Sequence, residues 1–186
     1  MVYLPNNCTT GNLIHYLFLM KATDVVEVIQ LLTMHQIEVY VDGGWCVDAL
    51  VAKQTREHLD LDIATPHCYE KQLRILLRER GFEEVRMNDS RACNFVLKNP
   101  DGLLLDVHTY ELDENGHNIF GVAYEGTDLT GSGEINGYSV KCICAESTMK
   151  FHTGYPLDEN DYHDVLVLSQ HFSIPIPAEY HRFIKK

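Results

Sequence analysis

Two short segments of this chain alternate apolar and acidic residues, which strongly restricts the fold. One reads Leu-Asp-Leu-Asp-Ile and holds Asp60 and Asp62; the other reads Leu-Leu-Leu-Asp-Val-His and holds Asp106 and His108. Side chains two residues apart on a strand share one face, about 7 Å apart along the chain. If the two strands are neighbours, one side of their sheet is apolar and three carboxylates meet on the other.

This set of carboxylates suits magnesium chemistry. Mg²⁺ prefers oxygen ligands from a few carboxylates, water and substrate phosphates. Two such ions can hold both the attacking and the leaving oxygen of an in-line displacement. We therefore interpret Asp60 and Asp62 as Mg²⁺ ligands, and Asp106 as a general base or a further ligand. Spacing by itself leaves two other interpretations open. Asp60 and Asp62 could lie on a solvated strand edge, and Asp106 could be a buried, hydrogen-bonded residue.

A glycine pair, Gly43-Gly44, precedes these aspartates and lies between a predicted strand (37–41) and a predicted helix (45–52). Glycine permits unusual backbone angles and close approach of a ligand. The following helix N-terminus offers free N–H groups and a positive dipole end, so the pair is a candidate phosphate cradle. It is neither a Walker loop nor a dinucleotide motif, because both need more glycines at fixed spacing.

The remaining pattern predicts an α/β domain. The turn sequence Asn-Pro-Asp-Gly at 99–102 predicts two antiparallel neighbours on either side of it. Further expected elements are helices from 24, from 66 with Pro66 in the first helical position, and over 158–172; strands over 83–87, 93–97 and 103–112; and a loop with one short strand over 121–137.

Composition limits the possible partners. The net charge of −12 argues against nucleic acid, because such binding needs Lys and Arg to neutralise phosphates. An acidic surface suits a cationic small molecule, although many soluble proteins are acidic. The longest apolar run is too short to cross a membrane, so no membrane role is expected. The six scattered cysteines and the lack of a secretory signal indicate a cytoplasmic protein with reduced thiols.

Several motifs resemble the short lincosamide nucleotidyltransferases and, less closely, the aminoglycoside 2''-nucleotidyltransferases, which belong to the polymerase-beta-type superfamily. The resemblance covers roughly residues 24 to 170. The matching segments are Gly43-Gly44-Trp45-x-x-Asp48, Thr55-Arg56-x-His58-x-Asp60-x-Asp62, Leu105-Asp106-Val107-His108, residues 137–143, Phe151-His152-Thr153-Gly154-Tyr155 and Asp161-Tyr162-His163-Asp164.

The resemblance implies a fold, a reaction and a division of the chain. The fold is a mixed central sheet flanked by helices, with a small C-terminal helical part. The expected parts are an extension (1–20), a nucleotidyltransferase domain (21–145) and a helical segment (146–186). The reaction is Mg²⁺-dependent transfer of a nucleoside monophosphate, AMP from ATP being the first expectation, to a hydroxyl of a lincosamide or an aminoglycoside. Two Mg²⁺ ions and a monomer or homodimer are expected.

The resemblance also assigns roles to individual residues. Gly43 and Gly44 are expected to hold the β- and γ-phosphates, and Arg56 and His58 either to contact phosphates or to lock the loop. Trp45 and Asp48 are interpreted as structural, with Asp48 bonded to nearby backbone.

Candidates for the acceptor site are Tyr155 and His108. His108 could equally be a structural histidine. The acidic residues around 158–164 could line the acceptor pocket or form a solvated helix face. Two other functions stay open: the same reaction on a protein or metabolite acceptor, and a non-enzymatic module that binds cations or a partner. Magnesium-dependent nucleotide binding separates the last from the others.

Overall fold

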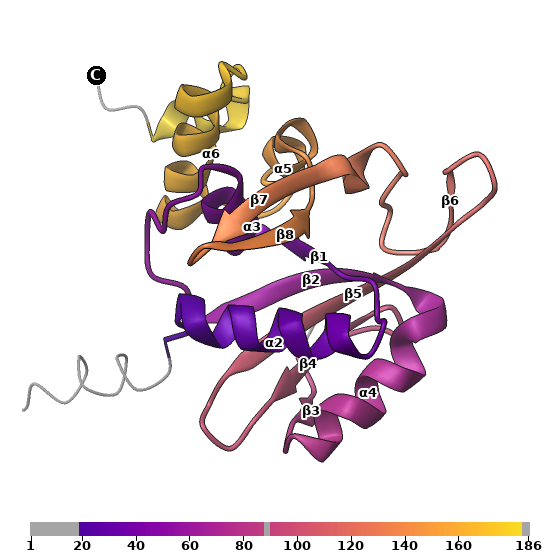
Figure 1. Ribbon diagram of the computed structural model, residues 1–186. Helices are drawn as coiled ribbons and strands as arrows, with labels where there is room; N and C mark the ends of the chain where they lie inside the picture. The colour runs from indigo at the N-terminus through magenta and orange to yellow at the C-terminus, as the bar shows by residue number, and fades with distance from the viewer. Residues whose placement is uncertain (1–18, 88–89, 184–186) are drawn as a thin grey trace, which may run out of the picture.

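The computed structural model describes residues 19–87 and 90–183 of the chain, and an eight-stranded sheet forms its centre (Figure 1). The strands are β1 (Tyr40–Asp42), β2 (Asp60–Pro66), β3 (Glu83–Val85), β4 (Asn94–Lys98), β5 (Leu104–Leu112), β6 (Asn118–Gly121), β7 (Gly131–Ile135) and β8 (Tyr138–Cys142). The helices are α2 (Ala22–Met34), α3 (Gly43–Leu50), α4 (Glu70–Glu79), α5 (Ala145–Phe151) and α6 (Glu159–Phe172), with short 3-10 helices η1 (His67–Tyr69), η2 (Asp128–Thr130) and η3 (Ala178–Arg182).

The sheet is mixed. Its strand order is β3-β4-β5-β2-β1-β8-β7, and β6 pairs with the end of β5. Strand β2 runs parallel to β5, and β1 runs parallel to β8. The other pairs are antiparallel, including β4 with β5 across the predicted turn. A mixed central sheet flanked by helices confirms the predicted α/β fold.

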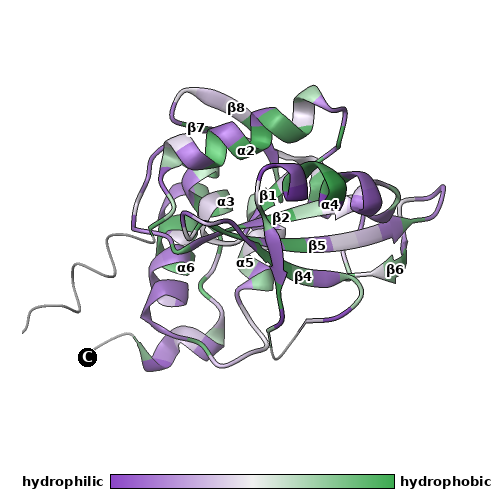
Figure 2. Ribbon diagram, turned by 90° about the horizontal axis from the view of Figure 1, so that it is seen from below, coloured by the Kyte–Doolittle hydropathy of each residue, from purple (hydrophilic) through white to green (hydrophobic). Residues whose placement is uncertain are grey.

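The two central strands have the predicted faces. Leu61 and Ile63 of β2, and Leu105 and Val107 of β5, are fully buried in the main core. Helices α2 and α4 cover this face of the sheet, while α5 and α6 lie on its other side (Figures 1 and 2). The acidic side chains of β2 and β5 alternate with these core residues, so they lie on the face opposite to the main core.

A second, smaller apolar cluster joins the C-terminal helices to α3. Val47 of α3 packs there with Met149 of α5 and Val165 of α6. Tyr180 of η3 is buried in the same cluster, and its hydroxyl donates to the carbonyl of His152. The C-terminal helices therefore rest on the helix that contains the glycine pair.

Helix α4 begins later than the sequence predicts. Pro66 is the last residue of β2, where it pairs with Tyr110 of β5, and the helix begins at Glu70 after η1. The fixed φ of proline, near −65°, suits the end of a strand as well as a first helical turn, so the sequence signal was ambiguous.

Other boundaries also differ. Helix α3 begins at Gly43, two residues before the predicted start at Trp45. The segment 121–137 contains η2 and β7, which matches a loop with one short strand. Strand β6 and helix α5 were not predicted as separate elements; both are too short to give a periodic pattern.

Two expectations concern larger parts of the chain. Most of the extension over residues 1–20 lies outside the described residues, and the division at residue 145 stays a prediction. Within residues 19–87 and 90–183, no helix is both long and apolar enough to cross a membrane.

Candidate active site

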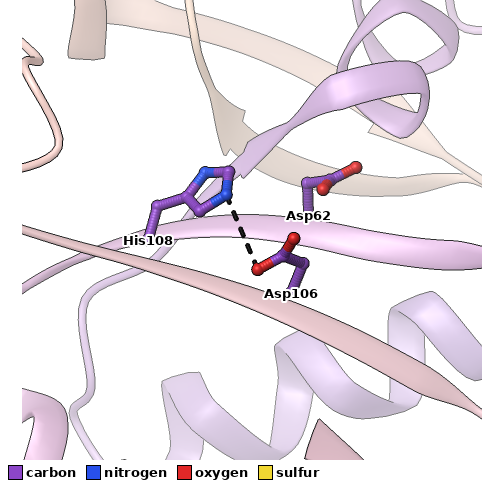
Figure 3. Close-up of side chains that lie close together, drawn as sticks. All are labelled: Asp62, Asp106 and His108. Atoms are coloured by element: carbon purple, nitrogen blue, oxygen red, sulfur yellow. Dashed lines mark ion pairs between the residues drawn. The ribbon is translucent and has the colours of Figure 1, made fainter. Parts of the chain in front are cut away.

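The pairing of three strands aligns three carboxylates on the polar face of the sheet. Asp62 of β2 is the register partner of Asp106 on β5 and of Asp42 on β1. His108 follows on β5, opposite Ala64. Figure 3 shows Asp62, Asp106 and His108 converging from the two central strands. The two strands are therefore neighbours, which is the condition under which their alternation puts the carboxylates on one side of the sheet.

The donors of this group fit a divalent cation. One potential ligand atom from each of Asp62, Asp106 and His108 lies within 4.8 Å of the other two. Oδ1 of Asp106 is buried and has no hydrogen-bond partner among the described residues. Carboxylate oxygens are the ligands that Mg²⁺ prefers. Asp60, the first residue of β2, lies outside this compact group, and its role as a ligand stays a prediction.

The carboxylates repel one another. Burial raises the pKa of Asp62 well above its ordinary value, and the charge of Asp60 raises it further. Burial and the charge of Asp106 likewise raise the pKa of Asp60. A cation placed between these groups offsets the repulsion and favours their ionised forms.

His108 belongs to a hydrogen-bonded chain behind the carboxylates. The hydroxyl of Tyr124 donates to Oδ2 of Asp42 (2.5 Å) and lies 2.9 Å from Nδ1 of His108. Nε2 of His108 lies 3.6 Å from Oδ1 of Asp106, the ion pair drawn in Figure 3. Burial opposes the charged form of this imidazole, but Asp106 and Asp42 hold the pKa of His108 well above its ordinary value.

Both glycines of the pair allow contacts that a side chain would block. Gly43 has φ +58°, and a Cβ atom there would overlap the carboxylate of Asp62. A Cβ atom at Gly44 would overlap Nη2 of Arg56 and the ring of His58. The start of α3 therefore lies against the acidic residues and the Arg56 guanidinium. The N–H of Gly43 donates to Oδ1 of Asp42 (2.8 Å), and the N–H groups that follow in the first turn have no partner within the helix.

Arg56 and His58 differ in their surroundings. Arg56 lines the cavity described below, and Nε and Nη2 donate to the two carboxylate oxygens of Asp164, at 2.8 and 2.7 Å. His58 is 2% exposed, and its Nε2 lies 2.6 Å from Asp48. Asp48 also accepts from the backbone N–H and the hydroxyl of Thr55, which confirms the predicted structural role of Asp48. Locking the loop is thus the role that the contacts of His58 support.

A cavity of about 620 Å³ opens in front of the glycine pair. Tyr155 lines it, and the Tyr155 hydroxyl donates to Asp161 (2.7 Å), while its role in binding the acceptor stays a prediction. Asp60 and Asp106 are not among the lining residues, whereas Asp62 and His108 are. The remaining lining residues come from β1, α3, the loop after α3, the segment after β6, the end of α5 with the two residues that follow it, and α6: Asp42, Gly43, Gly44, Arg56, Val122, Ala123, Tyr124, Lys150, Phe151, His152, Thr153 and Asp161.

Sequence analysis did not single out Asp42 or Tyr124 as site residues. Asp42 directly precedes the glycine pair, and the alternation Tyr40-Val41-Asp42 on a strand was a signal for its orientation. Tyr124 lies in an irregular segment, and no local pattern marks it. Asp164 was grouped with the acidic residues of a helix face, but it is buried and bonded to Arg56.

Comparisons with known proteins agree with this geometry. Residues 24–168 match the family described as aminoglycoside-2''-adenylyltransferase. A lincosamide resistance protein from Staphylococcus haemolyticus is 30% identical over 158 residues, which are 78% of this chain and 96% of that protein.

Solved structures show the same likeness. The lincosamide antibiotic adenylyltransferase LnuA, solved with lincomycin bound, superposes with a TM-score of 0.69 at 25% identity, covering 79% of this chain and 95% of LnuA. ANT(2'')-Ia in complex with adenylyl-2''-tobramycin gives a TM-score of 0.63 at 18% identity, covering 81% and 88%, and this likeness concerns the fold. By its sequence match and its fold, the chain belongs to the aminoglycoside-2''-adenylyltransferase family and is a nucleotidyltransferase.

Proposed function

We propose that this protein transfers AMP from ATP to a hydroxyl group of a small cationic antibiotic and so confers resistance to it. The observation that carries the proposal is the alignment of Asp62 with Asp106 beside the start of α3. Acidic ligands for a metal and a phosphate cradle lie side by side there, as transfer from a nucleoside triphosphate requires. The nucleotide makes the cytoplasm the expected compartment.

Mg²⁺ would be held by Asp62 and Asp106, with Asp60 as a further candidate ligand. When bound, it would neutralise phosphate charge, and a pair of such ions can hold the attacking and leaving oxygens. The N–H groups at the start of α3 and the guanidinium of Arg56 would bind phosphate oxygens.

The transfer is one in-line displacement. The acceptor oxygen bonds to the α-phosphorus of the nucleotide, and the bond from that phosphorus to pyrophosphate breaks. The carboxylate of Asp106 would accept the proton of the acceptor hydroxyl as the general base of the reaction. Positioning and electrostatic stabilisation supply most of the rate enhancement in such a reaction.

The cavity favours a lincosamide as acceptor. Val122, Ala123 and Phe151 give it an apolar wall, and among the described residues Asp161 is its one lining carboxylate apart from the aligned aspartates. One carboxylate beside an apolar wall suits an acceptor with a single basic amine and apolar groups, which describes lincosamides. An aminoglycoside carries several amines and needs more acidic partners.

Pyrophosphate release tests the proposal. The protein is incubated with Mg²⁺, each of the four nucleoside triphosphates and a panel of lincosamides and aminoglycosides. Asp62→Asn serves as the inactive control, and Glu84→Gln, at a surface ion pair with Arg74, serves as the matched active control. We expect release that needs ATP and a lincosamide. Release with aminoglycosides alone contradicts the lincosamide assignment, and nucleotide binding without release on any antibiotic moves the acceptor to another class of molecule.

A further inference from the structure

A long-range ion pair connects the loop after α3 to the C-terminal helix α6. Arg56 and Asp164 are separated by 108 residues in the sequence, yet they form two parallel hydrogen bonds of 2.8 and 2.7 Å. Such a bidentate pair fixes the plane of the guanidinium as well as its position. The side chain of Asp164 is 1% exposed, whereas that of Arg56 is 21% exposed and reaches the cavity.

Asp164 is itself held in place. Nε2 of His152, at the end of α5, lies 3.4 Å from Oδ2 of Asp164. Nδ1 of His152 lies 2.8 Å from the carbonyl oxygen of Thr148, so this nitrogen is the donor and the ring has a fixed orientation. Burial opposes the charged form of Asp164, but Arg56 and His152 keep the pKa of Asp164 below its ordinary value. The carboxylate is therefore ionised and rigid.

The guanidinium of Arg56, which lines the cavity, keeps two N–H groups that bond to none of the described residues. Arg56 uses three of its five N–H groups within the described residues, two on Asp164 and one, from Nη1, on the carbonyl of Glu57. The two remaining N–H groups belong to Nη1 and Nη2. Nη2 lies so close to Gly44 that a Cβ atom there would overlap it, which places it beside the N-terminus of α3.

We infer that Asp164 is a positioning residue of the nucleotide site: it holds the Arg56 guanidinium beside the start of α3, so that Arg56 and the backbone N–H groups form one clamp for a phosphate group. This inference rests on the proposed function and deepens it. It makes α6 a part of the nucleotide site, whereas its acidic residues were interpreted as lining the acceptor pocket or forming a solvated helix face. An arginine without this partner would have to lose its side-chain freedom each time a phosphate binds.

A double-mutant cycle tests the inference. The variants are Asp164→Asn, Arg56→Lys and the double variant, with Glu84→Gln as the control that removes a carboxylate from an arginine far from the site. Binding of Mg·ATP is measured by calorimetry on each folded protein, KM is measured for nucleotide and acceptor, and unfolding is followed in urea. The cycle separates effects through a shared partner from independent ones.

We expect Asp164→Asn to weaken Mg·ATP binding roughly ten-fold or more, with KM for the acceptor changed less than about two-fold. The double variant should bind Mg·ATP no more weakly than Arg56→Lys, because Asp164 acts through Arg56. Wild-type ATP affinity in Asp164→Asn, with a lowered unfolding midpoint, would show that the pair only attaches α6 to the core and would overturn the inference. Additive losses in the cycle, or a change confined to the acceptor KM, would overturn it as well.

Loss of a partner from a buried pair is costly, so Asp164→Asn may be set aside if it does not fold. Arg56→Lys then decides, since lysine keeps a cation beside Asp164 but lacks the second arm of the fork. A ten-fold loss of ATP affinity supports the clamp, and an unchanged affinity overturns it. If the wild-type protein binds none of the four nucleoside triphosphates, the proposed function and this inference are both overturned. If the wild type binds a nucleotide and the variants bind it equally well, only the inference is overturned.

Discussion

Asp62 on β2 and Asp106 on β5 are direct register partners on two neighbouring parallel strands. Neighbouring strands lie about 4.8 Å apart, so two ionised carboxylates at partner positions repel each other strongly unless a cation lies between them. The sheet thus builds a cation site from its own geometry, and the burial of Asp62 adds to the repulsion that a cation relieves.

Neutral substitutions at this pair should separate metal binding from folding. Asp62→Asn and Asp106→Asn should each lower pyrophosphate release by roughly a hundred-fold or more. Each variant removes a ligand of the metal, and the metal would neutralise the phosphate charge. Mg²⁺ should raise the melting temperature of the wild type, since a ligand that binds the folded state stabilises it. The same ion should leave the melting temperature of Asp62→Asn almost unchanged. A variant that keeps most of its activity would refute the role of that residue.

The glycine pair should not tolerate alanine. Gly43→Ala introduces a Cβ atom against Asp62 and at φ +58°, where non-glycine residues are strained. We expect loss of nearly all nucleotide affinity, measured by calorimetry. Gly137→Ala is the matched control: Gly137 also has a positive φ (+77°), but a Cβ atom there has nothing within 4 Å. This control should cost about 1 kcal/mol of stability and bind nucleotide normally. Equal behaviour of the two variants would contradict the close-approach argument.

Removal of the Tyr124 hydroxyl should disturb the hydrogen bonds that connect Tyr124 with Asp42 and His108 behind the carboxylates. Tyr124→Phe leaves Oδ2 of Asp42 without its shortest hydrogen bond, at a cost of about 1–3 kcal/mol in unfolding free energy. It also frees the ring of His108, so activity should fall about ten-fold with a smaller change in KM for nucleotide. Tyr69→Phe, at a hydroxyl without a hydrogen bond to the described residues, is the control. If Tyr124→Phe kept wild-type stability and activity, the hydrogen bonds among Tyr124, Asp42 and His108 would have no role in the site.

The contribution of His152 to stability should depend on pH. Burial opposes its charged form, but Asp164 and the carbonyl of Thr148 raise the pKa of His152 above its ordinary value in the folded protein. Its contribution is therefore fully present below the unfolded pKa and is lost as pH rises through the raised folded pKa. Urea denaturation should show His152→Gln more destabilised at about pH 6 than at about pH 8.5. A destabilisation that is the same at both pH values would show that His152 is neutral throughout.

Asp161 should influence the acceptor and not the nucleotide. Its carboxylate accepts from Tyr155, and both side chains line the cavity. Asp161→Asn keeps the size of the side chain but removes the charge that would attract an amine, so KM for a cationic antibiotic should rise roughly ten-fold. KM for ATP should stay within about two-fold of wild type. A rise confined to the nucleotide KM would assign Asp161 to the phosphate side of the cavity.

Local sequence patterns were sufficient for several parts of the fold. The alternation around Asp62 and Asp106 specified two strands and the face that each side chain occupies. The turn at 99–102 specified that β4 and β5 are antiparallel neighbours, and Gly102 donates to the carbonyl of Asn99 as such a turn requires. The short elements β6 and α5 were not predicted, because a few residues do not establish a hydrophobic period.

The sequence by itself determined which side chains share a face, because that follows from the geometry of one strand. Only the tertiary structure decided that Asp42 joins Asp62 and Asp106, and that Arg56 is held by Asp164, 108 residues away. Those contacts depend on which strands become neighbours and on how α6 packs against α3. Such packing is a property of the whole buried core, and no segment of the chain contains it.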